Sequence, residues 1–114
     1  MLKIMATLFF AALAGAAAAQ GCSEIRFARG AFSGQVSGQA DFDAPLCFSF
    51  GTGAGQQARL QILGSNNVCF AIEGIVDCTD DFTFRTRQGT YYVNVFQALR
   101  NGGDRTFALR LTIQ

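Results

Sequence analysis

The 114-residue sequence predicts an all-β protein, a small antiparallel β-sandwich of about seven or eight strands that is stapled by disulfides. Two observations predict the strands. Short stretches alternate apolar and polar residues with period two, and turns rich in glycine and asparagine separate them. A third observation predicts the staples, because four cysteines in a small exported domain are expected to form two disulfides. Beyond residue 19, no stretch carries the apolar stripe of an amphipathic helix.

Residues 1–19 predict a cleaved signal peptide, which leaves residues 20–114 as a single domain. Lys3 supplies a positive start, an apolar run follows, and small alanines precede Gln20. The run is too short and too poor in bulky residues to be a good membrane-spanning helix. Because it leaves with the signal peptide, we expect no membrane insertion after cleavage. The alternative is a lipoprotein acylated at Cys22, but Gln20 stands where such a signal has a small or branched residue. We therefore expect a periplasmic or secreted protein without a lipid.

Residues 32–42 show the clearest period-two pattern. The even positions carry Phe, Gly, Val, Gly, Ala and Phe, whereas the odd positions carry Ser, Gln, Ser, Gln and Asp. This alternation is typical of a half-buried strand. A phosphate-binding loop is excluded because no helix follows to offer its amide groups. A shorter strand is expected before it, where Ile25 and Phe27 alternate with charged residues up to Gly30.

Further strands are expected at residues 46–50, 58–62, 68–72 and 82–84. The last two strands have the strongest composition. Residues 90–100 are rich in β-branched and aromatic side chains, and residues 105–113 place four large apolar side chains on one face. Between them, Asn101-Gly102 predicts a tight turn. Both central positions of such a hairpin turn need positive φ, which favours asparagine and glycine. We therefore expect these two strands to form a hairpin.

The four cysteines allow three sets of pairings. We favour Cys22–Cys47 together with Cys69–Cys78, since each bond closes a short stretch, and the other two sets stay open. A zinc site is a poor alternative, because the sequence has neither CxxC spacing nor any histidine.

The charged residues exclude several classes of function. The nine basic residues include Lys3 of the leader, so the domain balances eight arginines against eight acidic residues. No long basic face results, and no nucleic-acid partner is expected. Without histidine the chain cannot build a Ser–His–Asp or Cys–His site, so we expect no enzyme and no cofactor. Asp77, Asp80 and Asp81 are read as solvated loop acids, with a calcium site as the weaker alternative.

Arg100 is the residue that most suggests binding to a partner. It stands beside Asn101-Gly102, and Arg105 follows the turn. An arginine on a short, stiff turn offers a rigid fork of donors to an acidic cleft. The alternative is an ordinary solvated arginine at a strand end.

A resemblance to a known family runs through several of these stretches. It begins in IRFARGAFSGQVSGQ, continues through an aromatic strand that ends at Phe50 and a strand that opens at Gly55-Gln56, and returns in the last third of the chain at Gly89, Tyr91, Val95, Gln97 and Arg100. In this spacing the chain resembles the bacterial periplasmic inhibitors of g-type (goose-type) lysozyme. Similar spacing of glycines and aromatics occurs in pre-peptidase C-terminal-type sandwiches.

The resemblance implies a β-sandwich whose loops enter the substrate cleft of a lysozyme, where the catalytic glutamate lies. Arginines that make key contacts in the family match Arg100 and Arg105, and a family tyrosine after the second strand is Asp43 here. With Asn101 in the same loop, these are the expected partner-binding residues. The implied partner is a protein, a lysozyme of the g-type first. The alternative is a secreted binding or structural sandwich of the cell envelope that inhibits no lysozyme.

Overall fold

A computed structural model describes residues 21–100 and 105–114. The expected signal peptide and the turn at Asn101 lie outside these residues, so both stay predictions. In the described part of the chain there are no helices. Its strands are β1 (Cys22–Glu24), β2 (Ser33–Gln39), β3 (Leu46–Thr52), β4 (Gln57–Leu63), β5 (Val68–Ile72), β6 (Val76–Thr79), β7 (Asp81–Arg85), β8 (Gly89–Gln97) and β9 (Thr106–Ile113).

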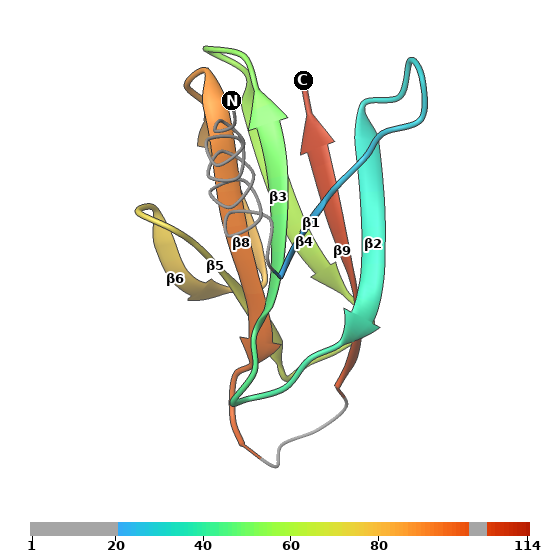
Figure 1. The fold of residues 1–114 in the computed structure, drawn as a ribbon, viewed down its shortest axis with the longest axis vertical. Helices are drawn as coiled ribbons and strands as arrows, with labels where there is room; N and C mark the ends of the chain where they lie inside the picture. Colours follow the sequence, from blue (N-terminus) through green and yellow to red (C-terminus); the bar gives the residue numbers. More distant parts are fainter. Residues whose placement is uncertain (1–20, 101–104) are drawn as a thin grey trace, which may run out of the picture.

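The strands form two sheets, which confirms the predicted all-β sandwich (Figure 1). One sheet has five strands in the order β1-β3-β8-β5-β6, and the other has four in the order β2-β9-β4-β7. The strand pairs are antiparallel, as predicted, except that β1 runs parallel to β3. The chain changes sheet repeatedly, and its connections therefore gather at the two ends of the sandwich.

The core lies between the two sheets. Alternate residues of each central strand point inward, because successive side chains of a strand point to opposite faces of its sheet. Rings from opposite sheets meet there, with Phe48 and Phe107 in an edge contact at a centroid distance of 6.4 Å. Burial of each such side chain contributes about 1.5–3 kcal/mol. The largest fully buried side chains are Phe50, Leu60, Phe70, Ile72, Val93, Val95, Leu109 and Leu111.

The period-two reading of residues 32–42 is confirmed by β2, whose exposed and half-buried residues alternate strictly. The glycines on its inner face have a steric reason. A Cβ on Gly34 would lie 2.7 Å from the backbone oxygen of Arg26 and 2.9 Å from the ring of Phe27. The chain before β2 thus packs directly against this strand, and only glycine leaves room for it.

The two edge strands of the five-stranded sheet, β1 and β6, differ from the prediction. The first strand ends at Glu24 rather than continuing through Phe27. Ile25 still donates a backbone hydrogen bond to Ser49 at 2.8 Å and is buried in the core, so its apolar character reflects packing at the strand end. The sequence reading also missed β6, whose VDCT sequence shows no clear alternation.

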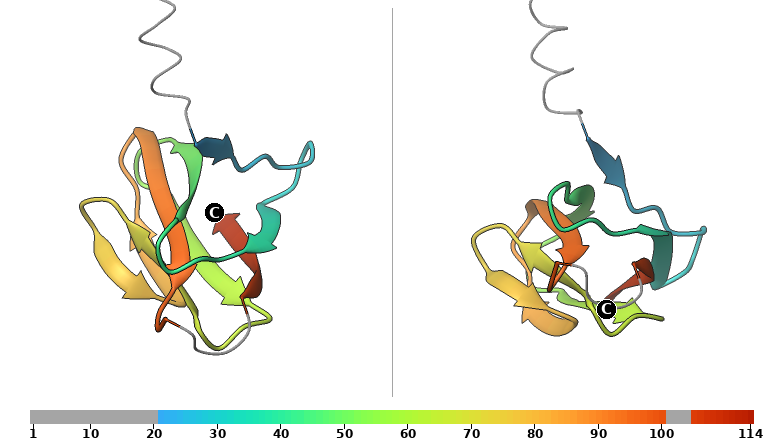
Figure 2. Two further views of the ribbon diagram at one scale, coloured as in Figure 1. Left: turned by 60° about the horizontal axis from the view of Figure 1, so that its bottom comes forward. Right: turned by 90° about the horizontal axis from the view of Figure 1, so that it is seen from below.

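The predicted hairpin between the last two strands is wrong. β8 pairs with β3 and β5 in one sheet, whereas β9 pairs with β2 and β4 in the other. The two strands lie apart in all views (Figure 1, Figure 2). The chain therefore passes from one sheet to the other between the end of β8 and the start of β9. An Asn-Gly pair favours a local turn but does not determine which strands pair.

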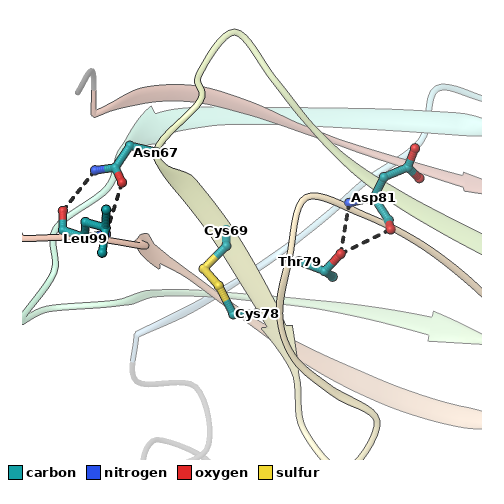
Figure 3. The surroundings of a disulfide bond; sticks show 6 residues. All are labelled: Asn67, Cys69, Cys78, Thr79, Asp81 and Leu99. Carbon is teal, nitrogen blue, oxygen red and sulfur yellow. Dashed lines mark hydrogen bonds between the residues drawn. A yellow bond between two sulfur atoms is a disulfide. The ribbon is translucent and has the colours of Figure 1, made fainter. Parts of the chain in front are cut away.

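Both favoured disulfides are confirmed. Cys22 and Cys47 are directly opposed in the register of β1 and β3, with their Cα atoms 4.4 Å apart. The bond between Cys69 and Cys78 joins β5 to β6 (Figure 3). Each disulfide holds a short edge strand of the same five-stranded sheet onto its neighbour. Because Sγ of Cys22 is bonded to Cys47, it is not available for the lipid of the alternative reading.

Candidate partner-binding end of the sandwich

Three connecting segments meet at the lower end of the molecule in Figure 1, and we call this region the three-loop end. Its described segments are residues 40–45, 64–67 and 98–100. Backbone hydrogen bonds join them, from Ala98 to Asn67 at 2.8 Å and from Gln97 to the Asp41 carbonyl at 3.5 Å. These hydrogen bonds hold the segments, and the side chains that they carry, in place relative to one another.

Arg100 and Asp43, both predicted as partner-binding residues, form an ion pair with each other. The Nη1 and Nη2 atoms of Arg100 donate to the two carboxylate oxygens of Asp43 at 2.7 and 2.9 Å. The guanidinium also lies 4.4 Å above the ring of Phe42, a cation–π contact. These hydrogen bonds lower the pKa of the Asp43 carboxyl below its ordinary value of 3.8 and raise the pKa of Arg100. Both side chains are largely exposed to solvent.

Arg105 has a different place in the same region. Its Nε donates to the carbonyl of Ala40 at 2.8 Å, and the backbone of Ala40 donates back to the carbonyl of Arg105 at 2.8 Å. This double contact joins the end of β2 to the start of β9. Arg105 thus helps to hold the segment that begins at Ala40 in place. Asn101, the fourth predicted residue, lies outside the described residues.

The sequence reading missed two residues that shape this end. Asn67 lies before β5 and is buried, and its side-chain amide binds the backbone of Leu99 through two hydrogen bonds of 3.0 Å (Figure 3). Leu99 itself is exposed. No local signal separates Asn67 from its neighbour Asn66, because the contact joins segments far apart in the sequence.

A cavity of about 770 Å³ lies at the opposite end of the sandwich. Among its lining residues Glu24 has the only ionisable side chain, and this side chain lies 3.4 Å from Arg26 in an exposed ion pair. The lining otherwise consists of amides, hydroxyls, glycines and apolar groups. Glu24 therefore has no second ionisable side chain beside it in this lining.

The described residues form neither a cluster of metal ligands nor a helix that could span a membrane. Within residues 21–100 and 105–114, no three histidine, cysteine or acidic residues cluster in a way that could hold a metal ion. Of the three acids considered for calcium, Asp81 is turned instead onto Arg59, with contacts of 2.7 and 2.9 Å. No helix in the same part of the chain is long and apolar enough to span a membrane.

Comparison with solved structures identifies the class of fold. Two-sheet sandwiches of this arrangement occur in periplasmic lysozyme inhibitors, which confirms the resemblance noted in the sequence. The inhibitor of g-type lysozyme PliG from Aeromonas hydrophila superimposes with a TM-score of 0.68 at 23% identity, over 82% of this chain and 96% of that protein. PliG from Salmonella Typhimurium gives a TM-score of 0.64 at 19% identity, over 82% of this chain and 97% of that protein.

A second kind of protein shares the fold less closely. The pre-peptidase C-terminal domain of collagenase from Bacillus anthracis gives a TM-score of 0.51 at 11% identity, over 82% of this chain and 94% of that domain. No family model matches the sequence, and no curated protein matches it significantly. At identities this low, structural similarity establishes the fold alone, and function has to be argued from the site.

Proposed function

We propose that this chain is a periplasmic or secreted inhibitor of g-type lysozyme, which acts by blocking the substrate cleft with its three-loop end. The observation that carries the proposal is the position of Arg100, an exposed arginine fixed by Asp43 and Phe42 at the end of a fold shared with PliG proteins. The absence of histidine and the inhibitor neighbours both support a binding role rather than an enzymatic one.

The contacts of Arg100 suit it to a carboxylate in an enzyme cleft. Asp43 occupies only the Nη edge of the guanidinium, which leaves the Nε side to donate to a second carboxylate. Because the guanidinium is already held in place, little conformational entropy is lost on docking. Contact with the catalytic glutamate of a lysozyme would hold that group away from the sugar and exclude substrate from the cleft.

The proposed function is tested with the purified mature protein and lysozymes of the g-, c- and i-types. We expect the lysis of bacterial cell walls by the g-type enzyme to slow in proportion to the added protein, and the other two classes to be affected less. Undiminished lysis by every g-type enzyme tested contradicts the proposal. In that case the second candidate, a non-inhibitory binding sandwich of the envelope, is favoured, since the collagenase domain shows that the fold also serves other proteins.

The proposed location has its own measurement. Mass spectrometry of the exported protein should find an N-terminus at or near Gln20 and no lipid, because Cys22 is bonded to Cys47. A diacylated Cys22 would contradict both the expected cleavage site and the disulfide.

A further inference from the structure

The side chain of Leu99 is an unusual feature of the three-loop end. It is 69% exposed, directly before Arg100 in the chain. A single exposed leucine is common on protein surfaces and by itself indicates nothing. Here, however, the backbone of Leu99 is held by the side chain of a residue 32 positions away in the sequence.

The side chain of Asn67 holds both backbone groups of Leu99. Nδ2 of Asn67 donates to the carbonyl of Leu99 at 3.0 Å, and the amide of Leu99 donates to Oδ1 of Asn67 at 3.0 Å (Figure 3). A third bond runs from the amide of Ala98 to the backbone carbonyl of Asn67 at 2.8 Å. Asn67 is only 7% exposed, so these bonds are largely shielded from competing water. The side-chain amide thus binds both backbone groups of Leu99, as a neighbouring strand would, and fixes the position of Leu99.

The surroundings of Leu99 combine apolar surface with a balanced charge pair. Phe42 is 38% exposed and lies beneath the guanidinium of Arg100. Because Asp43 neutralises that guanidinium, long-range attraction to an acidic partner is weakened. Much of the affinity must then come from apolar surface that is buried on contact, and Leu99 offers the most exposed apolar side chain of this group.

We infer that Leu99 is an anchor side chain, which enters an apolar subsite of the partner's cleft beside the carboxylate that Arg100 meets. Asn67 is the positioning residue, which keeps the anchor in its binding geometry before contact. This inference rests on the proposed function, because it assigns the partner the cleft of a lysozyme. It adds a second requirement for that partner, an apolar wall next to its carboxylate.

The first test compares Leu99→Ala with Ile75→Ala. Ile75 is 40% exposed and lies in the turn between β5 and β6, away from the three-loop end, which makes it a matched control. We expect Leu99→Ala to raise the inhibition constant for g-type lysozyme at least about tenfold, as for a central apolar contact. Ile75→Ala should stay within about twofold of wild type.

The results separate this inference from the proposed function. Inhibition by Leu99→Ala equal to that by wild type overturns the anchor and leaves the inhibitor function standing. If wild type inhibits no g-type lysozyme, the function fails, and the inference fails with it.

The second test distinguishes positioning from general stability. Asn67→Asp keeps an acceptor for the amide of Leu99 but loses the donor to its carbonyl, and Asn67→Ala loses both. We expect both variants to slow association with the lysozyme several-fold at a temperature well below their melting points, because fewer molecules hold the binding geometry. In a Leu99→Ala background the same changes should have little further effect. An equal slowing with and without the leucine side chain overturns the positioning role.

Discussion

Arg59 and Asp81 form an ion pair with the same two distances as the pair at the three-loop end. The contacts are 2.9 and 2.7 Å between Arg59 and Asp81, and 2.7 and 2.9 Å between Arg100 and Asp43. Both pairs are exposed, but Arg59 and Asp81 lie on neighbouring strands β4 and β7, outside the three-loop end. The molecule therefore contains its own control for the effect of an exposed arginine–aspartate pair.

We predict that Arg100→Ala weakens inhibition of g-type lysozyme at least about thirtyfold while leaving folding nearly unchanged. Loss of a charged partner that is desolvated in a complex leaves the opposing carboxylate without its contact, whereas an exposed pair adds little to folding. The inhibition constant from cell-wall lysis and the melting temperature measure the two effects. Arg59→Ala, the matched control, should inhibit like wild type. If both arginine variants inhibit equally well, Arg100 is not the contact we propose.

The titration of Asp43 gives a second prediction. Hydrogen bonds from Arg100 place the pKa of Asp43 in the folded protein below its ordinary value of 3.8. The pair therefore stabilises the fold above that value, and its contribution is lost as the pH falls through the lowered pKa. A carbon-detected NMR titration should show a midpoint below 3.8 in wild type, and a midpoint close to it in Arg100→Ala. Identical midpoints in the two proteins would contradict the observed pair.

Much of the fold could be predicted because strand formation leaves a local record. The alternation in β2, and the apolar positions Phe107, Leu109 and Leu111 of β9, follow from the period of a strand. The disulfides could be favoured because each closes a short stretch. The pairing of β8 and β9 could not be predicted in this way, since which sheet a strand joins depends on contacts across the whole chain.

The site could be predicted only in part for the same physical reason. Arg100 and Arg105 were found because arginine beside a turn is a local signal, strengthened by the family resemblance. That Asp43 pairs with Arg100 is a contact between residues 57 positions apart, and Asn67 meets Leu99 across 32 positions. Neither contact has a signature in the local sequence, although together they determine what the three-loop end presents to a partner.

The two disulfides should contribute unequally to stability. Their cysteines are 25 and 9 positions apart in the sequence, and for loops of about these lengths loop entropy gives about 3.5 and about 2.6 kcal/mol. We therefore expect Cys22→Ser/Cys47→Ser to lower the melting temperature by more than Cys69→Ser/Cys78→Ser does, with each double variant losing roughly 10 °C or more. Thermal unfolding followed by circular dichroism measures both. The intact protein should weigh four hydrogens less than its reduced form, and titratable thiols in the native protein would contradict both bonds.

Gly34 should be a sensitive position of β2. A methyl group there would lie 2.7 Å from the backbone oxygen of Arg26, which cannot move aside as a flexible side chain can. We expect Gly34→Ala to destabilise the domain by about 1–3 kcal/mol, measured by urea denaturation. Gly51→Ala in β3 is the control, because the nearest contact of its methyl group would be at 3.9 Å. Equal stability of the two variants would show that β2 shifts freely away from the segment before it.

Asp43→Asn tests what the ion pair does for binding. In the free protein the carboxylate neutralises Arg100, so its replacement adds one unit of positive charge to the three-loop end. Attraction between this end and an acidic cleft then increases, and we expect association with g-type lysozyme to become several-fold faster at low ionic strength, with a steeper dependence on salt. Stopped-flow or surface-binding kinetics at two salt concentrations measure the change, and Asp81→Asn, which removes the matched carboxylate, should leave the rate near that of wild type. Slower association of Asp43→Asn would mean that Asp43 serves mainly to hold the Arg100 fork in its docking geometry, and that this support outweighs the charge it cancels.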